Sequence, residues 1–161
     1  MKKGDSIMPK NRAPFQVLIF PYFIEKKSSQ IEYALFKRED MDVWQGIAGG
    51  GDLGETPFEA AKRETREESG ISGDKFFIQL DSKATIPVEY VVGKFLWGNE
   101  IYVIPEYCFG VEVMEKKVII SQEHTECIWV NFEKAMELLE WDSNKNALWE
   151  LNKRILREVT K

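Results

Sequence analysis

Apolar and polar residues alternate along the chain in blocks that predict strands interleaved with helices. Residues 15–20 and 31–38 are apolar runs rich in β-forming side chains, and the polar, turn-like segment 25–30 separates them. We expect these two runs to pair as a hairpin. Further strands are expected at residues 76–84, at residues 100–113 with a break near Pro105, and at residues 127–130.

The first helix is expected to begin after Thr56. Thr56 is a favourable N-cap, Pro57 suits the first helical position, and Glu59 stands three residues after the cap, as in a capping box. We expect the helix to run to Ser69, and Gly70 to end it in the left-handed conformation that glycine adopts readily.

The segment in front of this helix, residues 48–54, contains four glycines. Glycine permits backbone angles and close approaches that other residues resist. We therefore expect a loop with a functional purpose between the second strand and the first helix.

Two more helices are expected near the C-terminus. Asn131 can cap a helix that runs through Leu139, and Ser143 can cap a last helix with regularly spaced apolar residues. Because strands and helices alternate without an internal repeat, we predict one α/β domain with a mixed sheet. Residues 1–13 are expected to form a polar leader, and residues 14–161 the domain.

Composition narrows the class of protein. The 161 residues are 43% hydrophobic and 30% charged, which is typical of a globular domain, and the net charge of −5 opposes binding to nucleic acid polymers or anionic membranes. Cys108, Cys127 and His124 are too few for a disulfide scaffold or a four-ligand zinc site. The N-terminus lacks the apolar core of a signal peptide and no run is long enough to span a membrane, so we expect a cytoplasmic protein.

The first helix carries the most informative side chains. At about 100° per residue, Glu64, Glu67 and Glu68 fall on one face, next to the arc expected to be buried. Carboxylates this close repel one another unless a cation neutralises them, and oxygen ligands without His or Cys favour Mg²⁺, Ca²⁺ or Mn²⁺. Because Mg²⁺ is commonly shared with phosphate groups, a phosphate-bearing substrate is expected. A solvated acidic face is the alternative explanation of the spacing alone.

The surrounding residues resemble the signature of the Nudix hydrolase family, G-x5-E-x7-R-E-U-x-E-E-x-G-U, in which U is aliphatic. The signature residues stand at the required spacing over residues 49–71, as Gly49, Glu55, Arg63, Glu64, Glu67, Glu68, Gly70 and Ile71. Thr65 departs from the pattern, because the family prefers an aliphatic residue there. The resemblance implies a Nudix-like α/β/α sandwich with a mixed β-sheet.

Outer motifs are similar to the bacterial dATP pyrophosphohydrolase branch, which includes dihydroneopterin triphosphate pyrophosphohydrolase. These motifs are Phe36-Lys37-Arg38, Val43-Trp44-Gln45, Glu123-His124 with Trp129-Val130, and Trp141-Asp142-Ser143-Asn144. The branch more commonly has a Trp-Ser-Asn run without the additional Asp142.

The resemblance implies roles for the signature residues. Glu64 and Glu68 would bind the divalent cation, with help from the Gly49 carbonyl, and Glu67 would be a further ligand or the base. Arg63 would orient Glu67 as part of the catalytic set, and Glu55 would be a structural acid.

Outside the helix, the resemblance gives Glu123 a metal-binding or water-activating role, in preference to Glu126. A solvated loop acid is the alternative for Glu123. Arg38, Trp44 and Gln45 are candidate substrate-binding residues, although Arg38 can equally be an exposed strand-end arginine and Trp44 a buried core residue.

The sequence therefore predicts a Mg²⁺- or Mn²⁺-dependent enzyme that cleaves a nucleoside triphosphate, or an analogue such as dihydroneopterin triphosphate, to a monophosphate and pyrophosphate. Hydrolysis of ADP-ribose or dinucleoside polyphosphates, a non-catalytic nucleotide sensor and a structural or protein-interaction domain are the alternatives. The expected partner is a small nucleotide or pterin polyphosphate, and a homodimer is left open.

Overall fold

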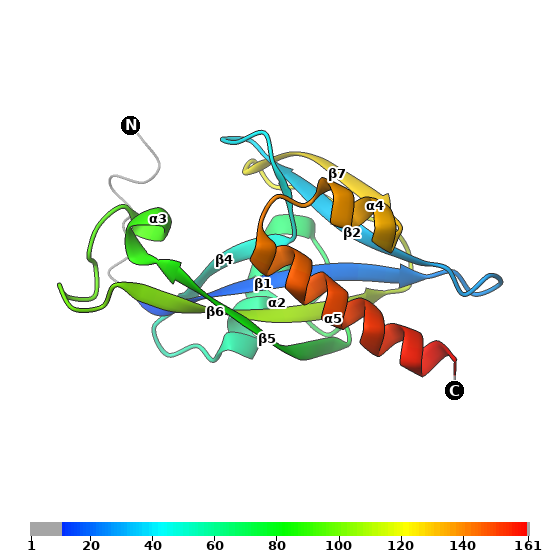
Figure 1. Ribbon diagram of the computed structural model, residues 1–161, viewed down its shortest axis with the longest axis horizontal. Helices are drawn as coiled ribbons and strands as arrows, with labels where there is room; N and C mark the ends of the chain where they lie inside the picture. Colours follow the sequence, from blue (N-terminus) through cyan, green and yellow to red (C-terminus); the bar gives the residue numbers. More distant parts are fainter. Residues whose placement is uncertain (1–10, 161) are drawn as a thin grey trace.

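Seven strands form one mixed sheet with helices on both faces in the computed structural model, which describes residues 11–160 (Figure 1). The elements follow one another as β1 (Arg12–Ile24), β2 (Ile31–Arg38), β3 (Trp44–Gln45), β4 (Ile47–Asp52), α2 (Pro57–Ser69), β5 (Phe77–Pro87), α3 (Val88–Val92), β6 (Val103–Val113), β7 (His124–Val130), α4 (Phe132–Leu138) and α5 (Asp142–Val159).

Strand β1 is the centre of the sheet. One side of it pairs in parallel with β6, from Gln16 opposite Glu106 to Phe23 opposite Val113. The other side pairs antiparallel with β4 near its start and with β2 at its end, so β2 and β4 share one flank of β1. The expected hairpin of β1 and β2 is confirmed.

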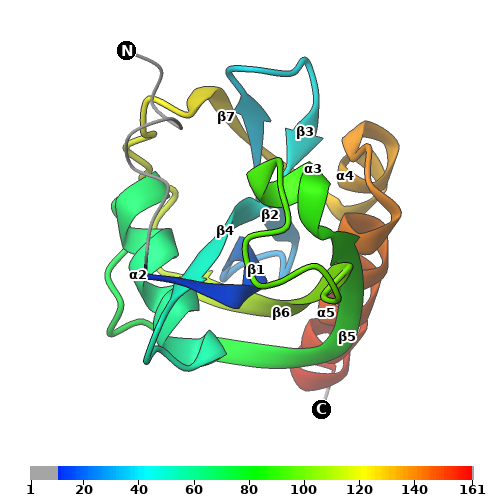
Figure 2. The ribbon, with the colours of Figure 1, turned by 90° about the vertical axis from the view of Figure 1, so that its left-hand side faces the viewer.

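Alternate residues of the strands build two separate cores. Leu18, Phe20 and Cys108 pack with α5 residues such as Leu148 and Leu151 on one face. On the other face, the second cluster includes the α2 residues Ala60 and Ala61 and comprises Val17, Ile19, Ala34, Phe36, Ile47, Ala60, Ala61, Ile71, Phe77, Phe109, Val111 and Val113. Figure 2 shows the resulting layers, with α2 on one side of the sheet and α5 on the other. The predicted α/β/α arrangement is confirmed.

Helix α2 has the ends that its sequence predicts. The Thr56 hydroxyl accepts from the Glu59 amide, the Glu59 carboxylate accepts from the Thr56 amide, and Gly70 adopts a left-handed conformation at φ 75°. The small, fully buried Ala60 and Ala61 let the helix approach the sheet closely. The helix end that carries the glutamates is therefore held at a defined place against the strands.

The glycine-rich segment corrects one expectation. Its first part, up to Asp52, is a strand and not a loop, because residues 47–52 form β4 and pair with β1. The glycines are needed where neighbouring side chains fill the space: a Cβ at Gly49 would lie 2.2 Å from the Glu64 carboxylate, and one at Gly51 would lie 2.0 Å from the Phe15 ring. The turn itself comes later, at Gly54 with φ 90°.

Three boundary predictions near the ends of elements are wrong. Ser143 does not cap α5, because the helix begins at Asp142 with Trp141 as its N-cap. Pro105 does not break β6, because pairing of β6 with β1 begins only at Glu106, so the missing N–H costs no bond to β1. Strand β7 begins at His124 instead of Cys127.

Short elements escaped the sequence analysis, namely the two-residue β3 and the five-residue α3. Residues 1–10 of the expected leader lie outside the described residues, and β1 begins at Arg12, two residues before the expected domain boundary. Within residues 11–160, none of the helices is long and apolar enough to cross a membrane.

Candidate active site

Three of the four glutamates of α2, Glu64, Glu67 and Glu68, lie along one edge of the helix but differ in exposure. The Glu68 side chain is 5% exposed, that of Glu64 is 12% exposed, and that of Glu67 is 52% exposed. The acidic face therefore runs from the packed interior to solvent. Glu68 is buried and Glu64 is largely covered, which a merely solvated acidic face would not require.

Arg63 links this acidic face to the β4–α2 connection. Its Nη1 donates to Glu64 Oε1 at 2.8 Å and to Glu67 Oε1 at 3.2 Å. Its Nε donates to Glu55 Oε2 at 2.7 Å, and its Nη2 donates to the Gly50 carbonyl at 2.8 Å. One guanidinium thus connects the end of β4, the following turn and two glutamates of α2.

Glu55 completes this link from the other side. Its Oε1 accepts from the Asp52 amide at 2.8 Å, so the carboxylate closes the turn while it binds Arg63. The Arg63 hydrogen bond lowers the pKa of Glu55, and the same bond is the main cause that raises the pKa of Arg63. The predicted structural role of Glu55 agrees with these contacts.

Arg63 compensates the charge of Glu64 only in part. Burial raises the pKa of Glu64 to about 7, although the hydrogen bond from Arg63 acts in the opposite direction. The carboxylate occupies the space left by the missing side chain of Gly49. A cation beside Glu64 would stabilise the charged form of this buried acid.

Glu68 meets a second segment of the chain, which precedes β7. The Ser121 hydroxyl donates to Glu68 Oε1, and His124 Nδ1 lies 3.3 Å from the same oxygen, close enough for an ion pair but not aligned as a hydrogen bond. Burial opposes ionisation of Glu68, but His124, Glu123 and Ser121 together lower its pKa. The fold therefore brings Glu123 next to α2, across 55 residues of sequence.

The donor set suits a hard divalent cation, although its side chains do not converge. Among residues 11–160, no three His, Cys, Asp or Glu side chains form a ready metal-binding group. The reason is visible in the contacts: Glu64 and Glu67 turn toward Arg63, and Glu68 turns toward Ser121 and His124. The buried Glu64, its raised pKa and the all-oxygen chemistry fit Mg²⁺ or Mn²⁺ after side-chain rotation.

The three candidate substrate-binding residues lie at one end of β2 but face different ways. Arg38 stands opposite His124 in the sheet, and its Nε and Nη2 bind Asp40 at 2.8 and 2.6 Å. Trp44 packs toward the α5-side core with Lys37 5.6 Å from its ring centroid. Gln45 is buried and pairs with Phe36, a member of the α2-side core. The structure brings only Arg38 next to the Glu123 segment.

Two residues near the acidic face escaped the sequence analysis. Ser121 carries no motif that distinguishes it from other loop serines. Arg12 was assigned to the leader, yet its guanidinium lies over Gly50, where a Cβ would come within 1.9 Å of Nε. Burial lowers the pKa of Arg12 while the charges of Glu64 and Asp52 raise it, which places a cation near the acidic face. The position of the Arg12 side chain over Gly50 depends on strand register, which the sequence alone does not provide.

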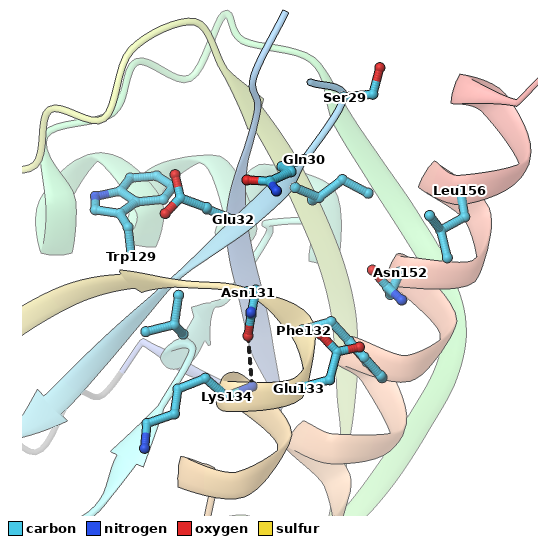
Figure 3. A pocket seen from close by; sticks show the side chains of 12 residues that line it. Ser29, Gln30, Glu32, Trp129, Asn131, Phe132, Glu133, Lys134, Asn152 and Leu156 are labelled. Atoms are coloured by element: carbon cyan, nitrogen blue, oxygen red, sulfur yellow. Dashed lines mark hydrogen bonds between the residues drawn. The ribbon is translucent and has the colours of Figure 1, made fainter. Parts of the chain in front are cut away.

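A separate hollow of about 580 Å³ lies at the other end of β2 (Figure 3). Its lining includes Glu32, Trp129, Lys134 and Asn152, and the Asn131 side chain accepts from the Lys134 amide at 2.9 Å beside it. Tyr33 pairs with Val130 at this end, whereas Arg38 pairs with His124 at the end near α2. Five residues of strand, about 17 Å, separate the hollow from the acidic face.

Comparison with known proteins agrees with this geometry. The chain is 27% identical to dihydroneopterin triphosphate diphosphatase of Haemophilus influenzae over 116 residues, which cover 71% of this chain and 73% of that protein. It is 30% identical to the asymmetrical bis(5'-nucleosyl)-tetraphosphatase of Mus musculus over 124 residues, which cover 76% and 80%. A crystal structure of a NUDIX hydrolase from Listeria monocytogenes is 42% identical, with a TM-score of 0.81, over 91% of this chain and 97% of that one.

The model of the NUDIX domain family matches residues 24–151, which include α2 and the segment before β7. The resemblance predicted from residues 49–71 is confirmed, and with it the prediction of an enzyme that hydrolyses phosphoanhydride bonds. The chain therefore belongs to the NUDIX domain family of hydrolases.

Proposed function

We propose that this protein hydrolyses a nucleoside triphosphate, or an analogue such as dihydroneopterin triphosphate, to a monophosphate and pyrophosphate. The observation that carries the proposal is the pair of carboxylates on one turn of α2, the buried Glu68 and the largely covered Glu64, with Glu123 held beside them. The similarity to the Haemophilus diphosphatase supports the choice of substrate class.

Mg²⁺ or Mn²⁺ would be held by Glu64 and Glu68, with Glu67, Glu123 and the Gly49 carbonyl as further ligands. When bound, the ion neutralises phosphate charge and acidifies a water molecule. Two buried acids next to a partly exposed one suit a site that is open to solvent on one side. The ion and the polyphosphate would then meet at the exposed end of the acidic face.

Glu67 would act as the base. It is more exposed than Glu64 and Glu68, and Arg63 Nη1 donates to it at 3.2 Å. Water would attack the phosphorus next to the sugar or pterin side chain, its proton would pass to Glu67, and the bond to the leaving pyrophosphate would break. Arg63 is a positioning residue, because Glu55 and Gly50 fix it in turn.

Arg38 would bind the leaving phosphates, and Trp44 and Gln45 would contact the organic part of the substrate. Arg38 lies at the end of β2. The backbone amide of the next residue, Glu39, donates to the backbone carbonyl of Glu123 at 2.9 Å. A phosphate would have to compete with Asp40 for the guanidinium, which a group with two negative charges does well.

A dinucleoside polyphosphate is the second candidate substrate. The observation in its favour is the 30% identity to the mouse tetraphosphatase over 76% of this chain. A screen of nucleoside triphosphates, dihydroneopterin triphosphate, ADP-ribose and diadenosine tetraphosphate with and without Mg²⁺, scored by product mass, separates these possibilities. Binding without turnover would indicate a nucleotide sensor, and neither binding nor turnover would indicate a structural domain.

Replacement of one buried acid tests the proposal directly. Glu68→Gln should lower turnover at least about a hundredfold, because a role in metal binding or proton transfer is lost. Thermal melting should show an intact fold, since an amide still accepts from Ser121. Glu59→Gln, on the same helix, is the matched control and should keep its rate, because glutamine also completes a capping box. Full activity of Glu68→Gln would remove Glu68 from the mechanism.

A further inference from the structure

A polar cluster lies on the α5-facing side of the sheet, where β1, β4 and β6 are neighbours. Cys108 and Leu18 belong to the α5-side core, so Glu106 and Gln16, two residues before each, face the same side. Gln16 pairs with Glu106 on one flank and with Gly50 on the other. The Arg12 guanidinium lies over Gly50 and donates to Gln16 Oε1 at 2.7 Å.

Two members of this cluster have unused hydrogen-bonding capacity. In the described part of the chain, three buried side-chain atoms lack a hydrogen-bond partner, and two of them are Glu106 Oε1 and Arg12 Nε. Glu106 is 4% exposed, and Ser143 at the start of α5 is the hydrogen-bond partner that the structure gives its carboxyl group. Burial raises the pKa of Glu106 to about 7, against the effect of Ser143.

A core position would favour an apolar residue over this acid. A carboxylate buried without full pairing destabilises a fold, and such groups concentrate at binding sites. The cluster lies on the opposite face of the sheet from Glu64 but at the same place along β4: Gly49 faces Glu64, the next residue Gly50 faces Arg12, and the charge of Glu64 acts on Arg12. Glu106 is two strands from Gly50, or about 10 Å.

We propose that Glu106 is a specificity-determining residue that accepts two N–H groups from the ring of the substrate. This inference rests on the proposed function. A carboxylate offers two parallel acceptors, which match a ring N–H next to an exocyclic amino group. Guanine, a 2-amino-6-oxopurine, and pterins, which are 2-amino-4-oxopteridines, share this edge. Adenine presents an acceptor, the ring nitrogen N1, beside its amino group. One carboxylate oxygen would then have no donor and would be repelled by N1.

The side chains around Glu106 must move for a ring to reach it, as side chains at binding surfaces commonly do. Arg12 is suited to such movement, because its Nε is without a partner and its long side chain lies along a glycine. Phosphates at Glu64 and a ring at Glu106 would then place Arg12 beside the link between them.

Comparison of GTP with inosine triphosphate tests the inference, because the two differ only in the 2-amino group. The wild type should show at least about a tenfold higher kcat/KM for GTP, as expected for a hydrogen bond to a charged acceptor. Glu106→Gln should bring this ratio to within about threefold of unity, because the amide keeps only one acceptor atom. Glu112→Gln, on the same face of β6 but less buried, is the matched control and should keep the wild-type ratio.

Binding of the monophosphates gives a second measurement that does not need turnover. Calorimetry should show that GMP binds the wild type more tightly than inosine monophosphate, and that Glu106→Gln removes this difference. Equal losses for both ligands in Glu106→Gln, or an unchanged ratio in a folded variant, would overturn the specificity role. If no triphosphate is hydrolysed but the GMP preference depends on Glu106, the proposed function fails while the ring-binding role stands.

Discussion

The space above Gly49 determines how Glu64 is held. A Cβ at this position would lie 2.2 Å from Glu64 Oε2, so alanine cannot coexist with the carboxylate in its present position. The obstacle is the end of a flexible side chain, and the backbone of β4 can therefore keep its pairing with β1. The fold should tolerate the change, but the proposed cation site should not.

Gly49→Ala should raise the Mg²⁺ concentration needed for half-maximal activity by about tenfold or more, because a displaced ligand binds the ion less well. A magnesium titration of the initial rate measures this shift, and thermal melting checks the fold. Gly73→Ala is the matched control, since a Cβ there meets Lys62 at an ordinary 3.4 Å. An unchanged magnesium requirement in Gly49→Ala would argue against Glu64 as a ligand.

At the scale of residues, helical spacing was enough to place Glu64, Glu67 and Glu68 on one edge of α2. It was not enough to rank their burial, because Glu68 is covered by Ser121 and His124 from a distant segment. Arg12 and Glu106 escaped for the same reason. Arg12 donates to Gln16 and Glu106 is opposite Gln16 in the sheet, which follows from strand register and not from a local motif.

Among the elements, α2 is the one whose ends the sequence predicts most clearly. The Thr56 hydroxyl accepts from the Glu59 amide at 3.1 Å, and the Glu59 carboxylate accepts from the Thr56 amide at 2.9 Å. These reciprocal bonds satisfy backbone groups that the first helical turn leaves without partners.

Thr56→Ala should lower the free energy of unfolding by about 1 kcal/mol, because the N-cap bond is lost. Urea denaturation followed by circular dichroism measures the change. Thr56→Ser retains a hydroxyl and should stay close to the wild type. Since the partner of Thr56 is Glu59 and not Glu64, Glu67 or Glu68, turnover at saturating Mg²⁺ should be unaffected. A large loss of turnover would show that the cap also positions the site.

Element predictions failed where tertiary contacts compete with local signals. Glycines in residues 49–51 indicate a loop by composition, yet they form a strand because Glu64, Arg12 and Phe15 occupy the places of their side chains. Ser143 is a good N-cap residue by type, but α5 begins one residue earlier and the Ser143 hydroxyl bonds to Glu106 instead.

On the scale of the whole molecule, Glu150 joins α5 to the edge strand β5. The pairing of β5 with β6 is irregular between Gln79 and Lys83. Glu150 accepts the Asp81 and Ser82 amides at 2.8 and 2.7 Å and Arg154 Nε at 2.7 Å. Burial opposes its charge, but these bonds prevail and lower the pKa of Glu150 to about 2.

This shift predicts a pH-dependent contribution to stability. Because the folded pKa lies below the ordinary value of 4.5, the contribution is complete above pH 4.5 and disappears as the pH falls toward 2. Glu150→Gln should therefore cost about 2 kcal/mol at pH 7 and progressively less below pH 4. Urea titrations at several pH values measure the difference.

Glu137→Gln serves as the control for this series, because Glu137 is exposed and pairs with Lys134 at 3.6 Å on the surface. It should change stability by less than about 1 kcal/mol at any pH. A constant difference between wild type and Glu150→Gln over the whole pH range would contradict the assigned cause.

The parallel pairing of β1 with β6 has a consequence for how the chain reaches its native state. On one of its two flanks, the central strand pairs with residues about ninety positions later, at Gln16 opposite Glu106. Contacts of such long range slow folding, because a large loop must close before they form. During synthesis, β1 would remain without this neighbour until β6 had left the ribosome.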